Sequence, residues 1–455
     1  MNFGRDAMRR EIQVVWLLFV LGTACAGEDL APLPEPLSLG AALELAARSS
    51  HPELAEARAR QRRAESRLEQ AEADDDWRLD VEARLRLIDP DARALDQSVN
   101  DSRLGIALDK RLYDFGYTEA AIDSARHAVE EQRLALFDAR RRRLLVTLRA
   151  FFDVLLADLA YSRDNEAMSV QFVRLDKKRN AHELGQVSDL ALARAEDDYQ
   201  RARVARAASE LKQRLARQRL ANALNRPRGL PSELEEPELG IAALPAPDFD
   251  PAIERALRHN PRLRALRERV SAATAALAQA RRAEGPVLRA RLGARAWQRE
   301  STSHHPLRAE LRLDVPLYTG GRRAAAVAEA RAGLDLARAR LASYRLSLRE
   351  RVLDRVLAIS RLKVALERQQ VLADRRDLEL DRSRALYEME VNTDLGDAMT
   401  QISAARLARR REQYELALAW VELKLLMGDE LNEQKLRALL AGDGGESAGR
   451  SAAAR

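Results

Sequence analysis

The sequence predicts a mainly α-helical fold with a membrane β-barrel portion, built from two structural repeats that each combine two strands with a long coiled-coil helical hairpin. Three observations carry this prediction. Short motifs recur at a nearly constant offset, two long stretches contain no proline, and four short segments alternate apolar with charged residues. In a chain of 455 residues these features favour an elongated molecule over a compact one.

The first 26 residues have the layout of a secretory signal peptide. Basic residues precede an apolar run over 14–21, and small residues follow it. That run is too short to cross a bilayer, so it indicates export. Two fates of Cys25, the only cysteine, stay open. Cleavage after Ala26 would remove it, whereas lipidation would make it the first residue of the mature chain, although Gly22 stands where a lipoprotein signal normally has leucine.

Two pairs of motifs recur 205 positions apart. LYDFG at 112–116 returns as LYTGG at 317–321, and VSDL at 187–190 returns as NTDL at 392–395. A third pair is separated by 209 positions and joins His51-Pro52 to Asn260-Pro261, which implies a short insertion in one copy. We therefore expect a first repeat over 37–224, a linker over 225–250, a second repeat over 251–428 and a partly disordered tail over 429–455.

Each repeat contains a long stretch without a helix breaker. No proline lies between Pro90 and Pro227, and Pro316 is the last in the chain. Apolar residues within these stretches follow a period of about 3.5, as at Leu144, Leu148, Phe151 and Leu155 and again at Val352, Val356, Ile359, Lys363 and Leu366. A helix from about Tyr117 to about His182 would extend roughly 100 Å at 1.5 Å per residue.

Each long helix is expected to reverse into a hairpin with a free tip. In the first copy a helix-stopping Gly185 precedes Ser188 and Asp189, which are N-capping residue types. In the second copy Asn392 or Thr393 is available as the cap.

Strands with two distinct faces precede each long helix. Apolar residues alternate with charged ones, and the predicted strands cover 77–88, 103–113, 287–298 and 307–318. Their length suits tilted barrel strands, but a soluble sheet packed on one side gives the same alternation. Four strands cannot close a membrane barrel, so we expect a trimer that forms a 12-stranded barrel on an α-helical tube.

The composition argues against several functional classes. Aromatic residues make up 4% of the chain and charged residues 33%, which is typical of long helices with narrow apolar seams. The net charge is +6, but arginine alternates with acidic residues along most of the chain, so we expect solvated faces and no nucleic-acid partner. No catalytic constellation or phosphate-binding glycine loop occurs, and His304-His305 has no cysteine or acidic cluster nearby. We expect no enzyme activity, metal or cofactor.

The order of helices, strand pair and long hairpin, performed twice, resembles the TolC-like outer membrane efflux proteins over about residues 37–428. The Leu-Tyr-x-x-Gly motifs and the two tip motifs carry the resemblance. It implies a homotrimer in the outer membrane of a Gram-negative bacterium, with helices that extend into the periplasm. It further implies the channel of a tripartite efflux or type I secretion system, a passive duct that works with a periplasmic adaptor (membrane fusion) protein and an inner-membrane transporter.

The resemblance also implies two kinds of functional residue. The hairpin tips would dock the adaptor through Leu184, Gly185, Val187, Ser188, Asp189, Asn392 and Thr393. Glu390 replaces a glycine that is usual in the family, which puts the second tip in doubt. Asp394 and Asp397 would line the periplasmic entrance as a ring of acids that favours cations. The alternative reading is that all of these residues only cap helices and complement their dipoles.

Two other functions stay open at this point. A periplasmic coiled-coil scaffold or adaptor without a pore explains the hairpins and the signal peptide, but it does not explain four two-faced strands. A cytosolic nucleic-acid-binding coiled coil explains only the charge. The cargo of a duct cannot be read from these residues.

Overall fold

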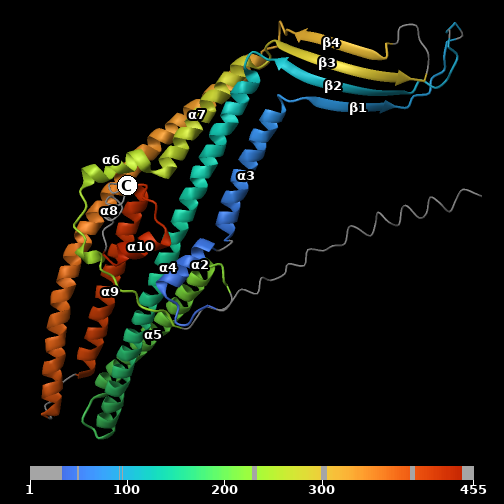
Figure 1. Ribbon diagram of the computed structural model, residues 1–455. Helices are drawn as coiled ribbons and strands as arrows, with labels where there is room; N and C mark the ends of the chain where they lie inside the picture. The colour runs from blue at the N-terminus through green and yellow to red at the C-terminus, as the bar shows by residue number, and fades with distance from the viewer. Residues whose placement is uncertain are drawn as a thin grey trace, which may run out of the picture.

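The computed structural model describes residues 33–48, 51–91, 93–94, 96–227, 233–298, 305–389 and 395–442. The molecule is elongated and mainly helical, with a small sheet at one end and two long helical hairpins reaching the other (Figure 1). Among the described helices, none combines the length and the apolar composition needed to cross a lipid bilayer.

The same order of elements occurs twice along the chain. The first half contains α2 (Leu39–Arg48), α3 (Pro52–Ala73), β1 (Arg78–Arg84), β2 (Arg103–Tyr113), α4 (Tyr117–Glu183) and α5 (Asp189–Ala223). The second half contains α6 (Phe249–His259), α7 (Pro261–Arg282), β3 (Val287–Trp297), β4 (Leu307–Asp314), α8 (Arg322–Glu388) and α9 (Leu395–Leu426). Both α4 and α8 have 67 residues, which is about 100 Å at 1.5 Å per residue.

The four strands form one antiparallel sheet in the order β1-β2-β3-β4. Two strands are shorter than expected. β1 ends at Arg84 and not at 88, with only an isolated bridge between Leu87 and Asn100 beyond it. β4 ends at Asp314 and not at 318, because Pro316 has no N–H to donate to a ladder.

The C-terminal tail, which the sequence predicts to be partly disordered, contains a packed helix in its first part. α10 (Glu433–Leu440) buries Leu436 and Leu440 completely or nearly so. The Leu440 carbonyl accepts a hydrogen bond from the Gly240 N–H at 2.8 Å, beside the short 3-10 turn η1 (Ile241–Ala243) of the expected linker. A helix of this length is marginal alone, so its packing supplies its stability. Residues 443–455 lie outside the described part.

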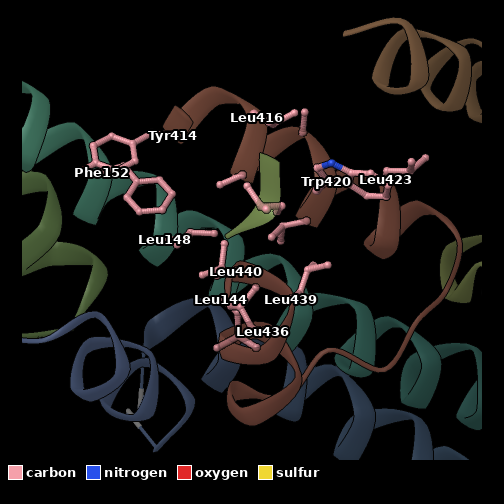
Figure 2. Packing of buried hydrophobic residues seen from close by; sticks show 14 of the residues in the cluster. Leu144, Leu148, Phe152, Tyr414, Leu416, Trp420, Leu423, Leu436, Leu439 and Leu440 are labelled. Atoms are coloured by element: carbon pink, nitrogen blue, oxygen red, sulfur yellow. The ribbon is translucent and has the colours of Figure 1, made fainter. Parts of the chain in front are cut away.

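The core lies where α10 and α2 pack against the middle of α4 and the end of α9 (Figure 2). Phe152 of α4 stacks on Tyr414 of α9 with ring centroids 4.3 Å apart. The predicted α4 seam, Leu144, Leu148, Phe151 and Leu155, is buried, as are Val352, Val356 and Ile359 of α8. Burying each such side chain stabilises the fold by about 1.5–3 kcal/mol before entropy is counted.

The long helices lie side by side in open rows. Toward the tips the order is α5, α4, α9, α8, and toward the sheet it is α3, α4, α7, α8. Each row therefore has a helix of the first half at one edge and α8 at the other. The sheet repeats this arrangement, with β1 and β4 as its edges.

Candidate functional site

The strand register separates the sheet into an apolar face and a charged face. Leu79 lies opposite Leu108, and Leu108 lies opposite Leu292. On the other face Asp109 lies opposite Arg291, which lies opposite Glu310. Because side chains alternate along every strand, this register extends both faces across all four strands.

The apolar face is bare. Leu307 is 76% exposed, Leu311 67% and Val81 69%. Figure 1 shows no helix over either face of the sheet. A soluble sheet packed on one side would bury these side chains, so that alternative does not account for this chain. An exposed apolar surface of this kind marks a contact with lipid or with another chain.

One charged side chain, Lys110, lies on the apolar face near its helical end. Its ammonium nitrogen lies 5.5 Å from the centre of the Trp77 ring. A lysine beside a tryptophan at the edge of an apolar band is typical of a membrane–water interface, where both side chains keep a polar end in water.

The repeated Leu-Tyr-x-x-Gly motif forms the turn from strand to long helix. Phe115 and Gly116 have φ angles of 57° and 84°, and Gly320 and Gly321 have 60° and 84°. Two successive left-handed residues thus occur in both copies, where glycine is favoured because it has no Cβ. In the first copy Asp114 caps the turn by accepting hydrogen bonds from the Thr118 N–H at 2.9 Å and the Gly116 N–H at 3.2 Å.

The charge of Asp114 is stabilised locally. Burial alone would raise the pKa of its carboxyl, but hydrogen bonds from Thr118 and from the Arg111 guanidinium outweigh burial and hold the pKa below its usual value. The Arg111 Nη1 lies 3.3 Å from the Asp114 Oδ2. The turn therefore stays tied to the end of β2 as an ion pair at neutral pH.

The first hairpin tip is an exposed glycine turn. The Gln186 N–H donates to the Ala181 carbonyl and the Gly185 N–H to the His182 carbonyl, with Gly185 at a φ of 70°. This is the Schellman arrangement that ends a helix. A Cβ added to Gly185 would meet nothing within 4 Å, so the turn is open on its outer side.

The predicted tip residues gather at this turn. Leu184 is 73% exposed, and the Asp189 side chain is almost fully exposed while it contacts the His182 Nε2 at 2.7 Å. Ser188 is the N-cap of α5, and its hydroxyl accepts from the Ala191 N–H at 3.4 Å. Val187 between them is partly exposed. Ser188 therefore caps α5, while the apolar Leu184 and the acidic Asp189 remain exposed at the tip.

Most of the second tip lies outside the described residues, as do Asn392, Thr393 and Asp394. Asp397 lies in the first turn of α9, half exposed. Its Oδ1 is 3.8 Å from the Arg174 Nη2 on α4, and its Oδ2 accepts from Gln401 at 2.7 Å. The sequence pattern did not reveal Arg174, which is more than 200 positions away and partly offsets this charge.

The part of the chain that the structure describes contains no group of three or more histidine, cysteine or acidic residues that could hold a metal ion. Cys25 lies outside that part, and so does His304. The candidate site is therefore a set of surfaces, namely the two sheet faces and the hairpin tips.

Residues 252–429 match the outer membrane efflux protein family. The fold is that of solved outer membrane channels. CmeC of Campylobacter jejuni superposes with a TM-score of 0.71 at 14% identity, covering 89% of this chain and 90% of that one. The resemblance to the TolC-like outer membrane efflux proteins is confirmed. The family and the fold agree with the predicted location in the outer membrane.

Two further channels show the same fold. VceC of Vibrio cholerae gives a TM-score of 0.68 at 18% identity, covering 87% of this chain and 97% of its own. The open-state MtrE channel of Neisseria gonorrhoeae gives 0.67 at 18% identity, covering 87% and 90%. No curated protein matches the chain in sequence. The solved structures that the chain resembles are outer membrane channels.

Proposed function

We propose that this chain is the outer-membrane channel of a tripartite efflux or type I secretion system, a passive export duct coupled to an inner-membrane transporter through a periplasmic adaptor. The observation that carries the proposal is the uncovered two-faced sheet. Its apolar face fits lipid and its charged face fits water, which is the arrangement of a barrel wall. The matched family and fold support the same function.

Closure of the wall needs several copies. The sheet and both helix rows are open arcs with unlike edges, so β4 and α8 of one copy can meet β1, α3 and α5 of the next. Such head-to-tail contacts form a ring when the rotation closes. Three copies would supply 12 strands, above the practical minimum of about eight.

The outer edges of the helix rows carry apolar side chains at coiled-coil spacing. Four apolar residues of α8 are seven apart and between 58% and 71% exposed, namely Leu357, Val364, Val371 and Leu378. On α5, Val204 and Leu211 are also seven apart, with Leu215 one turn on, and all three are exposed. A seven-residue repeat is the pattern that pairs one helix with another. These two stripes support contact between copies along the tube.

We assign adaptor docking to the first tip and, beyond the described residues, to Asn392 and Thr393. We also propose that Asp394 and Asp397 from all copies encircle the periplasmic entrance. Acidic rings favour cations. Arg174 lies beside Asp397 and weakens the negative potential that this acid contributes to the entrance.

Planar-bilayer recordings on detergent-purified protein test the proposed function. We expect stable trimers that conduct ions. The variant Leu357→Ser/Val364→Ser/Val371→Ser should lose the trimer and the conductance, because it removes the α8 stripe. A matched control, Gln370→Ser/Asp377→Ser/Arg384→Ser, changes another exposed face of α8 and should retain both. Monomeric protein that dissolves without detergent and does not conduct would support the scaffold function instead.

A further inference from the structure

The charged face of the sheet has a large excess of arginine. Within the four strands it carries nine arginines and five acidic residues, which leaves a net charge of +4 in each copy. The arginines are Arg78, Arg84, Arg103, Arg111, Arg289, Arg291, Arg295, Arg308 and Arg312, and the acids are Asp80, Glu82, Asp109, Glu310 and Asp314. The whole chain is far closer to balance, with 77 basic and 71 acidic residues.

Three of the arginines form an unbroken row at the helical end of the sheet. Arg111 lies directly opposite Arg289, and Arg289 lies directly opposite Arg312. One row across three strands is therefore entirely arginine. The next row alternates in sign, with Asp109, Arg291 and Glu310 opposite one another and the Arg291 Nε 2.5 Å from the Asp109 Oδ1.

Like charges placed directly opposite each other destabilise a sheet. Acidic residues beyond the row offset the repulsion at two of the three arginines, because Arg111 pairs with Asp114 at 3.3 Å and Arg312 pairs with Asp314 at 2.9 Å. Arg289, the central member, is exposed and forms no ion pair with any residue that the structure describes. Folding of the sheet alone gives no reason for a cation at this position.

The arginine row opens onto a pocket at the junction of sheet and helices. Its lining includes four arginines and three acidic residues, namely Arg111, Arg282 from the end of α7, Arg289, Arg312, Asp114, Glu284 and Asp314. The Arg282 Nη1 lies 3.4 Å from the Gly116 carbonyl, which holds this fourth guanidinium at the turn. Arginine side chains thus continue from the sheet to the start of the helical tube, where they exceed the acidic residues by one.

We propose that the sheet-level pore is electropositive and selects anionic solutes as the cargo class of the duct. This inference rests on the proposed function, because only a closed barrel turns the charged face into a pore lining. Three copies would then place three arginines each around one level of the pore. Rings of arginine favour anions, and walls of low dielectric constant strengthen their potential.

The acidic entrance proposed at the tips does not cancel this field. Arg174, which marks the level of Asp397, lies 57 residues beyond Tyr117 on α4, which is about 85 Å at 1.5 Å per residue. Charges separated by many Debye lengths, about 8 Å at physiological salt, act independently. The two ends can therefore be tested by separate substitutions.

Reversal potentials in a KCl gradient across a planar bilayer test the proposal. We expect the double variant Asp394→Asn/Asp397→Asn to prefer chloride over potassium. Adding Arg111→Gln/Arg289→Gln/Arg312→Gln should lower that preference by about threefold or more, because counter-ion concentration follows the local potential. Adding Asp109→Asn/Glu310→Gln instead should raise it. Both sets alter the same face, so damage to the sheet alone would not move the ratio in opposite directions.

Block by inorganic tripolyphosphate gives a second readout. Added on the sheet side, it should reduce the current through the double variant and should act at least about tenfold more weakly once the three arginines are replaced. An unchanged chloride-to-potassium ratio in that variant, or cation preference before the arginines are removed, would overturn the inference while leaving the channel intact. Complete loss of conductance in every variant would instead contradict the proposed function.

Discussion

Two buried arginines on α4 cap the helices that return beside it. Arg143 is 4% exposed and donates to the Asn222 and Ala223 carbonyls at the end of α5. Arg141 is 2% exposed and donates to the Leu425 carbonyl at the end of α9 at 2.6 Å. Burial lowers the pKa of both guanidinium groups, yet their ordinary value is so high that both remain charged. A cation suits the negative end of a helix dipole.

Replacing Arg143 should destabilise the core around the middle of α4. Arg143→Met leaves the Asn222 and Ala223 carbonyls without this donor, and we expect a loss of about 1–3 kcal/mol in the free energy of unfolding. Thermal unfolding of purified protein measures it. The neighbouring Arg142 is exposed and pairs with Asp138 at 3.1 Å, so Arg142→Gln should cost less than about 0.5 kcal/mol. Equal losses in both variants would refute the capping role.

The third motif pair marks a cap that reaches across the fold. The Asn260 Oδ1 accepts from the Leu263 N–H at 2.9 Å while its amide donates to the Leu426 carbonyl at 3.0 Å. His51 caps α3 in the same way and hydrogen-bonds to the Asn222 carbonyl, while burial and the nearby Arg143 lower its pKa. The sequence showed this pair only as a repeated motif, and its capping role became visible in the structure. Its long-range partner could not be predicted, because a motif carries no information about which helix end lies beside it.

At the scale of elements, the long helices were predictable and the short ones were not. α4 ends one residue beyond the predicted His182, because a proline-free stretch with a 3.5-residue period and a stopping glycine defines both length and end. α10 is only eight residues long, too short for a 3.5-residue period to stand out, and it depends on packing against α2 and α9. The strands were predictable from their period of two, whereas their ends depend on pairing partners.

The first tip leads to a prediction about docking. Asp189 is almost fully exposed at the N-terminus of α5, so Asp189→Lys reverses an exposed charge beside the turn. We expect this variant to lose photo-crosslinking from p-benzoylphenylalanine at Leu184 to the periplasmic adaptor of the native host. Mass spectrometry identifies the crosslinked protein, and gel filtration checks that the trimer persists.

A matched reversal separates docking from general charge effects. Asp198 lies farther along the same helix, half exposed and 2.8 Å from Arg201. Asp198→Lys should leave the crosslink intact. If Asp189→Lys also leaves it intact, or if the captured protein is not an adaptor, the tip does not dock in the proposed way.

At the scale of the whole molecule, the same sequential order appears in three layers. The sheet and both helix rows place the first half of the chain at one edge and the second half at the other. The duplication predicted two similar halves, but it did not predict that they would lie edge to edge with their apolar surfaces open. These apolar surfaces are exposed in a single copy, and they become buried only when other copies and lipid cover them.

Neighbouring residues of β2 test whether lipid covers the apolar face. Ile106 lies on the apolar face and Ala107 on the charged face. Cys25 is expected to be removed or lipidated, so a nitroxide on Ile106→Cys or Ala107→Cys would be the only label. In liposomes, membrane-dissolved oxygen should be the main relaxing agent for the label at position 106, and a water-soluble nickel chelate should be the main one for the label at position 107. The two differ because consecutive strand residues face opposite sides of a sheet. A water-exposed scaffold predicts strong relaxation of both positions by the chelate, so that result would exclude the barrel.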